Sequence, residues 1–312
     1  MTNELGMAHK PVLLNEVLKN LSPRDGETYL DCTFGAGGYS EAILNAAKCN
    51  LYAIDRDDIA EEFSKNLTKK FPQNFTFLRG KFSDSLALLA ERNITKLDGI
   101  VLDIGVSSMQ LDDRIRGFSF DSDAKLDMRM DQKNSLSAFE LVNEASEEEL
   151  ADIIKEFGEE PRARAIAKKI VHKRSETKIV TCLELAEIVR SFYRGYSRMD
   201  PATKTFQALR IFVNQELDEL RSILTSSLTL LKKDGRLVVV SFHSLEDEIV
   251  KKFLKKESGL DHSVSRYLPK SPQQKLSENF RIITKSAISP REEEVALNPR
   301  ARSAKMRVAI KL

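Results

Sequence analysis

The segment DCTFGAGGYS, which begins at Asp31, has the residue types of a turn that binds a nucleotide. An apolar run ends at Asp31, glycines follow at Gly35, Gly37 and Gly38, and a helix is expected from Ser40. Glycines let the backbone approach a bound nucleotide closely, and amides at the start of a helix can donate hydrogen bonds to it. The segment predicts a ligand-binding turn, although an ordinary glycine turn has the same composition.

A second acid stands at the spacing that such a turn needs. The next apolar run, NLYAID, ends in Asp55, twenty positions after Gly35. A carboxylate there can accept hydrogen bonds from both hydroxyls of a ribose, so the pair predicts a cofactor of the adenosine type. Ser40 replaces the third glycine of the dinucleotide fingerprint, which favours S-adenosylmethionine over a nicotinamide dinucleotide, because the former has no phosphate. The phosphate loop of nucleotide hydrolases is absent from the sequence.

Two further polar residues follow apolar runs. Asp103 ends LDGIVLD and is our candidate for a carboxylate between cofactor and acceptor, with a turn or helix cap as the alternative. His243 follows RLVVVSF, where it could act as a general base or simply orient its loop, and we favour the second role.

The elements that position these residues alternate between strand-like and helical patterns. We expect strands at 28–31, 51–55, 75–78, 99–103 and 236–242, the last one parallel and preceded by a KKDG turn, and two final strands at 280–284 and 305–310. Helices are expected at 40–47, 83–92 and 206–231 and from Ser244, whose side chain would cap the last of them. The pattern predicts an α/β fold.

The alternation breaks after Asp103. A polar stretch over 107–134 is followed by helical signals over 137–193, where Ser146 and Glu149 resemble a capping box. We therefore predict that residues 112–205 form an inserted helical subdomain for substrate recognition, and that 1–111 with 206–312 form the cofactor-binding domain.

Composition is that of a globular chain, with 41% hydrophobic and 31% charged residues. No apolar run or leader predicts a membrane span or secretion, and three scattered cysteines predict neither disulfides nor a metal site, so a cytoplasmic location is expected. The net charge is only +2, but residues 144–160 are strongly acidic, while 162–174 and 281–311 are rich in Lys and Arg. Basic patches of this kind attract phosphate.

Several long motifs resemble the bacterial ribosomal RNA small subunit methyltransferase H family from end to end. They are HKPVLL from His9, DCTFGAGGYS, AIDRD, LDIGVSSMQLDD, RGFSF, LDMRMD, GEEPRARAIAKKI, FQALRIFVNQEL, SFHSLEDEIVKKF and NPRARSAKMR. The resemblance implies a Rossmann-like class I methyltransferase sheet, mostly parallel, with an inserted helical subdomain. It also implies transfer of a methyl group from S-adenosylmethionine to the exocyclic N4 of a cytidine in the decoding centre of 16S rRNA.

Carried over by position, the resemblance implies a set of cofactor-binding residues in this chain. They are Gly37, Gly38, Tyr39, Asp55, Phe82, Asp103 and Gln110. Tyr39 stands where the family usually has histidine, which is tolerable if the contact is through the backbone amide, and Glu248 stands where an arginine is common. The segment DIGV replaces the aromatic motif that stacks on the base in many amino-methyltransferases, and Phe118 and Phe120 are possible substitutes with packing as the alternative.

The predicted partner is 16S rRNA, within the small ribosomal subunit, and a homodimer is compatible with the sequence. Two basic sets are candidates for phosphate contacts: Arg162, Arg164, Lys168 and His172, and Arg291, Arg300, Arg302, Lys305 and Arg307. Two other functions compete with the methyltransferase. A nicotinamide oxidoreductase would share the turn and acid, and an RNA-binding assembly factor would leave Gly37, Asp55 and Asp103 unexplained.

Overall fold

The computed structural model describes residues 11–195, 199–260 and 278–312. His9 and Lys10, the first two residues of the HKPVLL motif, lie outside the described residues. The described chain divides into two compact units, one made of the residues up to Gly105 together with Leu217–Leu312, the other of Val106–Glu216. Of the described helices, none is both long and apolar enough to cross a membrane.

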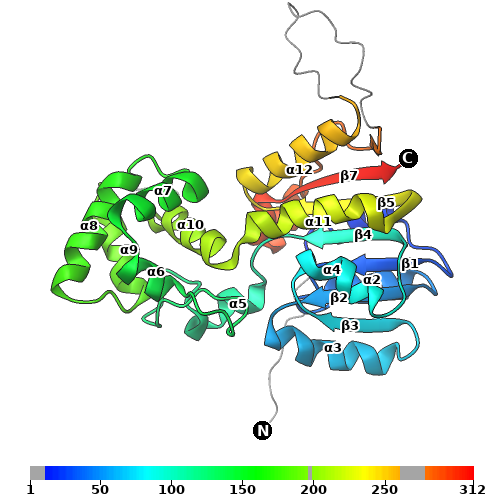
Figure 1. The fold of residues 1–312 in the computed structure, drawn as a ribbon, viewed down its shortest axis with the longest axis horizontal. Coiled ribbons are helices and arrows are strands. Elements are labelled where there is room, and N and C mark those ends of the chain that lie inside the picture. The colour runs from blue at the N-terminus through cyan, green and yellow to red at the C-terminus, as the bar shows by residue number, and fades with distance from the viewer. Residues whose placement is uncertain (1–10, 196–198, 261–277) are drawn as a thin grey trace, which may run out of the picture. The chain divides into compact units, whose positions relative to one another are not determined.

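The first unit contains a seven-stranded sheet in the order β3-β2-β1-β4-β5-β7-β6 (Figure 1). Its strands are β1 Thr28–Asp31, β2 Asn50–Asp55, β3 Phe75–Arg79, β4 Leu97–Asp103, β5 Leu231–Ser241, β6 Phe280–Ile282 and β7 Lys305–Lys311. The first five are parallel, β7 is antiparallel to β5, and β6 is antiparallel to β7. All seven predicted strands are confirmed, as is the parallel fifth strand.

The expected KKDG turn is instead a bulge inside β5. Leu97 of β4 pairs with Leu231 and Gly99 pairs with Arg236, so residues 232–235 of β5 stand opposite a single residue of β4. That residue, Asp98, lies 2.8 Å from the ammonium of Lys232. The extra residues are accommodated because Asp234 adopts a left-handed conformation with a φ of 65°.

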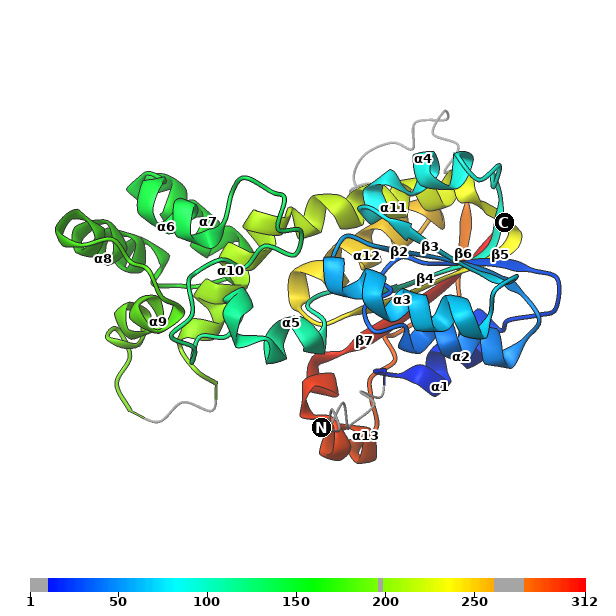
Figure 2. The same cartoon turned by 90° about the horizontal axis from the view of Figure 1, so that it is seen from below.

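Helices cover both faces of the sheet (Figure 2). One face packs on α1 Leu14–Leu21, α2 Gly38–Ala46 and α3 Asp58–Lys70, and the other on α4 Ser85–Ala90, α11 Glu216–Leu230 and α12 Ser244–Glu257. Alternate strand residues supply the two cores: Val101, Val238 and Val240 to the first, and Ile100, Leu102, Leu237 and Val239 to the second. A short helix η1 Phe82–Asp84 precedes α4, and α13 Glu292–Leu297 and η3 Pro299–Ser303 lie between β6 and β7.

The second unit is helical. It contains α5 Ser108–Asp112, η2 Arg114–Arg116, α6 Ala138–Glu144, α7 Glu147–Gly158, α8 Ala163–Glu176, α9 Cys182–Arg190 and α10 Ala202–Asn214 around one apolar core. Ser146 caps α7 by accepting a hydrogen bond from the amide of Glu149, as predicted.

The expected continuous helix over 206–231 is wrong. Gln215, with a φ of 53°, ends α10, and α11 begins at Glu216. The side chain of Asn214 is tied into the helical unit, since its Oδ1 accepts from the amide of Met130 at 2.8 Å and its Nδ2 donates to the carbonyl of Met128 at 2.8 Å. The two units divide between Gly105 and Val106 and between Glu216 and Leu217. The helical unit therefore extends further at both ends than the expected range 112–205.

Candidate active site

Three strands of the first unit end in aspartate next to one another. Asp31 ends β1, Asp55 ends β2 and Asp103 ends β4. Because β2 and β4 are the two neighbours of β1 and all three are parallel, their carboxyl ends form one edge of the sheet. In open α/β sheets this edge is where ligands bind.

Asp55 holds the glycine turn at this edge. Its Oδ2 accepts a hydrogen bond from the amide of Gly35 at 2.7 Å, and its Oδ1 accepts from the amide of Asp57 at 2.9 Å. A carboxylate has about four acceptor positions, so two remain for a pair of hydroxyl groups. The carboxylate thus has the capacity that the ribose of an adenosine cofactor requires.

The next two glycines are required by close packing. Gly37 has a φ of 83° and stands at the N-terminus of α2, where a Cβ would come within 2.8 Å of the ring of Phe34. A Cβ on Gly38 would collide with the ring of Pro11. The turn can thus bring the free amides of the first helical turn to the edge of the sheet.

Asp103 has a carboxylate oxygen prepared for a partner. Its backbone amide donates to Thr33 Oγ1 at 2.6 Å, which fixes the end of β4. Its Oδ1 is buried and has no hydrogen-bond partner among the described residues. Burial, together with the carboxyl groups of Asp31 and Glu246, raises the pKa of Asp103 well above its ordinary value. A buried acceptor of this kind is costly unless a ligand satisfies it.

Asp31 is a site residue to which the sequence analysis assigned no role. It is fully buried, and its carboxylate accepts from the amide of Thr33 at 3.1 Å and from the hydroxyl of Ser40 at 2.7 Å. Burial raises its pKa to about 6. Thr33 thereby links Asp31 to Asp103. The sequence signal was present, because Asp31 directly precedes the glycine turn, but its burial was not visible there.

Tyr39 directs its side chain into the protein. Its ring is 3% exposed, and its hydroxyl donates to the carbonyl of Val12. The aromatic side chain is engaged in the core, which leaves the backbone amide of Tyr39, at the start of α2, as the group available for a ligand.

The remaining expected cofactor contacts are divided between the units. Phe82 begins η1 after β3 and packs, half-buried, on the core of the first unit. Gln110 belongs to the helical unit, where its Oε1 accepts from the amide of Ser107 at 3.0 Å and closes the capping box of α5. The structure therefore brings Gly37, Gly38, Tyr39, Asp55 and Asp103 to one edge.

His243 orients a helix. It is the N-cap of α12, and its Nδ1 accepts from the amide of Glu246 at 3.4 Å while its Nε2 lies 2.9 Å from Glu246 Oε1. Glu246 in turn accepts from the amide of Phe242 at 2.8 Å. The geometry favours the orienting role, and the expected cap by Ser244 is wrong because His243 occupies that position.

The two phenylalanines considered for base stacking are packed inside the helical unit. Phe118 is 7% exposed in its core, and Phe120 makes an edge contact with Phe206 at 5.9 Å between ring centroids. These contacts favour packing over stacking on a base.

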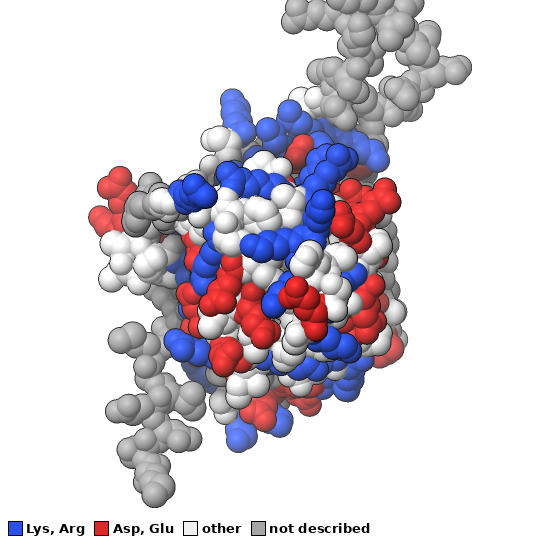
Figure 3. Space-filling view, turned by 90° about the vertical axis from the view of Figure 1, so that its left-hand side faces the viewer, with Lys and Arg blue, Asp and Glu red and all other residues white. Residues whose placement is uncertain are grey.

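The basic side chains differ in what they contact. Arg307 is not available for phosphate, because its guanidinium contacts Asp247 at 2.6 and 3.1 Å with the side chain 11% exposed, and Lys305 lies 3.5 Å from the same carboxylate. Arg162 stands 4.5 Å over the ring of Tyr193. Lys168, Arg164, Arg300 and Arg302 are exposed. The face drawn in Figure 3 carries both charge signs, with lysine and arginine gathered in its upper part.

Fold and site together define a class. A mostly parallel seven-stranded sheet with an antiparallel β7, a glycine turn after β1 and an acid at the end of β2 form the Rossmann-like class I methyltransferase fold, which uses S-adenosylmethionine. The fold class and the cofactor predicted from the sequence are confirmed.

The family follows from sequence comparison. Residues 6–312 match the model of the MraW methylase family. The chain is 51% identical over 308 residues to the ribosomal RNA small subunit methyltransferase H of Rickettsia felis, covering 98% of this chain and 99% of that protein. It is 52% identical over 305 residues to the protein of the same name from Rickettsia massiliae, covering 97% of each chain. The chain therefore belongs to the MraW methylase family, and the predicted resemblance is confirmed.

The similarity to solved structures is low. An rRNA methylase from Streptococcus thermophilus aligns over 98% of this chain and 99% of its own with 9% identity and a TM-score of 0.39. Family membership rests on the sequence relatives and sets aside the oxidoreductase alternative.

Proposed function

We propose that this methyltransferase transfers a methyl group from S-adenosylmethionine to the exocyclic N4 of a cytidine in the decoding centre of 16S rRNA. The relatives at about half identity over nearly the whole chain are named for the small-subunit RNA. The observation that carries the catalytic part is the buried, unpartnered Oδ1 of Asp103 at the carboxyl edge of the sheet.

The residues of the edge fit the cofactor. Asp55 would accept hydrogen bonds from its ribose hydroxyls, the amides of Gly37, Gly38 and Tyr39 would donate to its polar atoms, and Phe82 would border the site. We also assign Gln110 to the site, on the strength of its position in the family motif. When bound, the cofactor supplies a methyl group that its sulfonium has already activated.

The chemistry of the acceptor nitrogen determines what the protein must supply. The lone pair of a cytosine amino group is conjugated into the ring, so the nitrogen must rehybridise and shed a proton during transfer. Asp103 Oδ1 would accept a hydrogen bond from that amino group and draw positive charge away from it, and its burial without a partner supports this role. Asp31 and Thr33 act as positioning residues, because they fix the end of β4 that carries Asp103. Positioning of the acceptor then supplies much of the remaining rate enhancement.

We assign recognition of RNA to the inserted helical subdomain and to the basic segment before β7. Lys168, Arg300 and Arg302 are exposed and suited to phosphate contacts. Arg162, whose guanidinium lies over the ring of Tyr193, would also contact phosphate. Arg164 is a less favourable phosphate ligand, because it stands beside the carboxylates of α7. The substrate would be the RNA within the small ribosomal subunit, in the cytoplasm, and the protein could act as a homodimer.

The test is methyl transfer from radiolabelled S-adenosylmethionine to small ribosomal subunits from cells that lack this enzyme, followed by nucleoside analysis. Label in N4-methylcytidine is the expected result. Cofactor binding without label in that nucleoside would contradict the assigned acceptor, and absence of cofactor binding would contradict the function itself. RNA binding should also weaken between low and moderate salt, since phosphate contacts release counterions.

A further inference from the structure

An apolar groove with an acidic rim lies in the helical unit. Its floor contains Ile153, Phe157 and Phe212, and it is a shallow, open hollow of about 460 Å³ between α7 and α10. Phe157 and Phe212 are half-buried and lie 6.1 Å apart between ring centroids. Half-buried aromatic rings on a groove floor provide apolar area that a partner side chain can cover.

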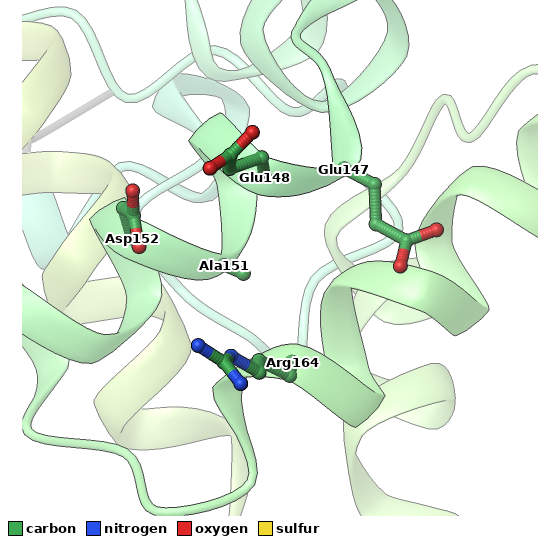
Figure 4. Close-up of a pocket in the computed structure, with 5 residues that line it drawn as sticks. All are labelled: Glu147, Glu148, Ala151, Asp152 and Arg164. Carbon is green, nitrogen blue, oxygen red and sulfur yellow. The ribbon is translucent and has the colours of Figure 1, made fainter.

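A second hollow of about 340 Å³ continues the groove. Glu148 and Asp152 line both hollows, and Arg164 of α8 completes the second one. Figure 4 shows Arg164 reaching toward α7, on which Glu148 and Asp152 lie. In the described part of the chain Arg164 forms no ion pair, and it is one basic side chain beside the three carboxylates Glu147, Glu148 and Asp152, so the rim keeps an excess of negative charge.

The rim carries more negative charge than favourable interaction with the dipole of α7 would explain. Carboxylates at 147, 148 and 149 stand in the first turn of α7, where they favour the helix dipole. Asp152 and Glu156 lie beyond that turn. Together with Glu148 they form a row of carboxylates spaced four residues apart along α7. Like charges at this spacing destabilise a helix, and neither Asp152 nor Glu156 has an ion pair among the described residues.

We propose that this groove docks a basic segment of a protein in which lysine or arginine side chains flank an apolar residue. The apolar residue would cover the phenylalanine pair, and the basic side chains would pair with Asp152 and Glu156. The inference rests on the proposed function in one respect, which is that the partner protein is part of the ribosomal substrate. Proteins that coat RNA are basic where they meet phosphate, so a ribosomal protein has the required chemistry, whereas RNA itself would be repelled by the rim.

The test compares two substrates and two variants. Binding of the protein to small ribosomal subunits and to 16S rRNA stripped of its proteins is measured by equilibrium titration. The groove variant Asp152→Asn/Glu156→Gln removes two charges from the rim. The control variant Asp123→Asn/Glu187→Gln removes two charges from exposed positions of the same unit that do not line the groove. Removal of like charges does not endanger the fold of α7, which circular dichroism would verify.

The groove variant is expected to bind the subunit about tenfold more weakly than wild type, since each exposed ion pair contributes up to about a fivefold effect. Its affinity for stripped RNA should not fall, and the control variant should match wild type on the subunit. Equal loss in both variants, or no loss in either, would overturn the proposal. An equal loss on stripped RNA would also overturn it, because the groove would then contact RNA instead. Methyl transfer by the wild-type protein to the same subunits, measured in parallel, tests the proposed function separately.

Discussion

Replacement of Asp103 by asparagine separates the chemistry of this carboxylate from its position. The two side chains have nearly the same volume, and the backbone amide that donates to Thr33 Oγ1 is unchanged. What the variant loses is the capacity of the buried carboxyl group to take up a proton. A proton acceptor placed on a reacting group contributes about 10²–10⁴-fold. We expect kcat for methyl transfer to fall by about a hundredfold or more while RNA binding stays intact.

The same variant should be more stable without cofactor. Because burial and the neighbouring carboxyl groups raise the pKa of Asp103, the folded chain holds this proton more tightly than the unfolded chain does. The resulting stability is present below the unfolded pKa and is lost as the pH rises through the folded pKa. Each pKa unit corresponds to about 1.4 kcal/mol. The neutral amide avoids that loss, so Asp103→Asn should exceed wild type in stability at pH 8, with the difference shrinking toward pH 4.

Single-turnover transfer of labelled methyl groups and urea unfolding at several pH values are the two assays. The exposed residue Asp84 provides the control Asp84→Asn in the same unit, which should change neither the rate nor the pH dependence. A wild-type rate in Asp103→Asn would refute the assignment of this carboxylate as the acceptor. A stability difference that does not depend on pH would refute the argument from its buried charge.

Three other perturbations test the edge of the sheet. Asp55→Asn should raise the Kd for S-adenosylmethionine by about 10–100-fold, because it weakens hydrogen bonds to a charged acceptor, and calorimetry showing an unchanged Kd would contradict the ribose assignment. Gly38→Ala places a Cβ against Pro11 and should cost about 1–3 kcal/mol of stability in urea unfolding, whereas an unchanged midpoint would mean that the turn relaxes without cost. Burial raises the pKa of Asp31 from 3.8 to about 6, so its carboxyl should cost the folded state about 3 kcal/mol as the pH rises through that range; Asp31→Asn should flatten this dependence, and a parallel pH profile would exclude Asp31 as its source.

The sequence by itself determined the sheet and the chemistry of its edge. Apolar runs, glycine turns and strand-end acids are local signals. Together they were sufficient to place Asp55 and Asp103 at the carboxyl ends of parallel strands. The break in that rhythm also indicated the helical insertion. The end of α10 at Gln215 could not be predicted, because a glutamine with positive φ carries no distinctive sequence signal. The KKDG segment indicated a turn, but the pairing of β5 with β4 on both sides of it depends on residues remote in sequence.

Only the tertiary structure decided what each polar group contacts. Arg307 looked like one more basic residue of a phosphate-binding segment, but its neighbour across the fold, Asp247, is sixty positions away in the chain. Tyr39 points into the core, and Asp31 is buried among partners that the turn brings to it. Burial, ion pairing and pKa depend on distances between residues remote in sequence, which the pattern of residue types along one chain does not specify.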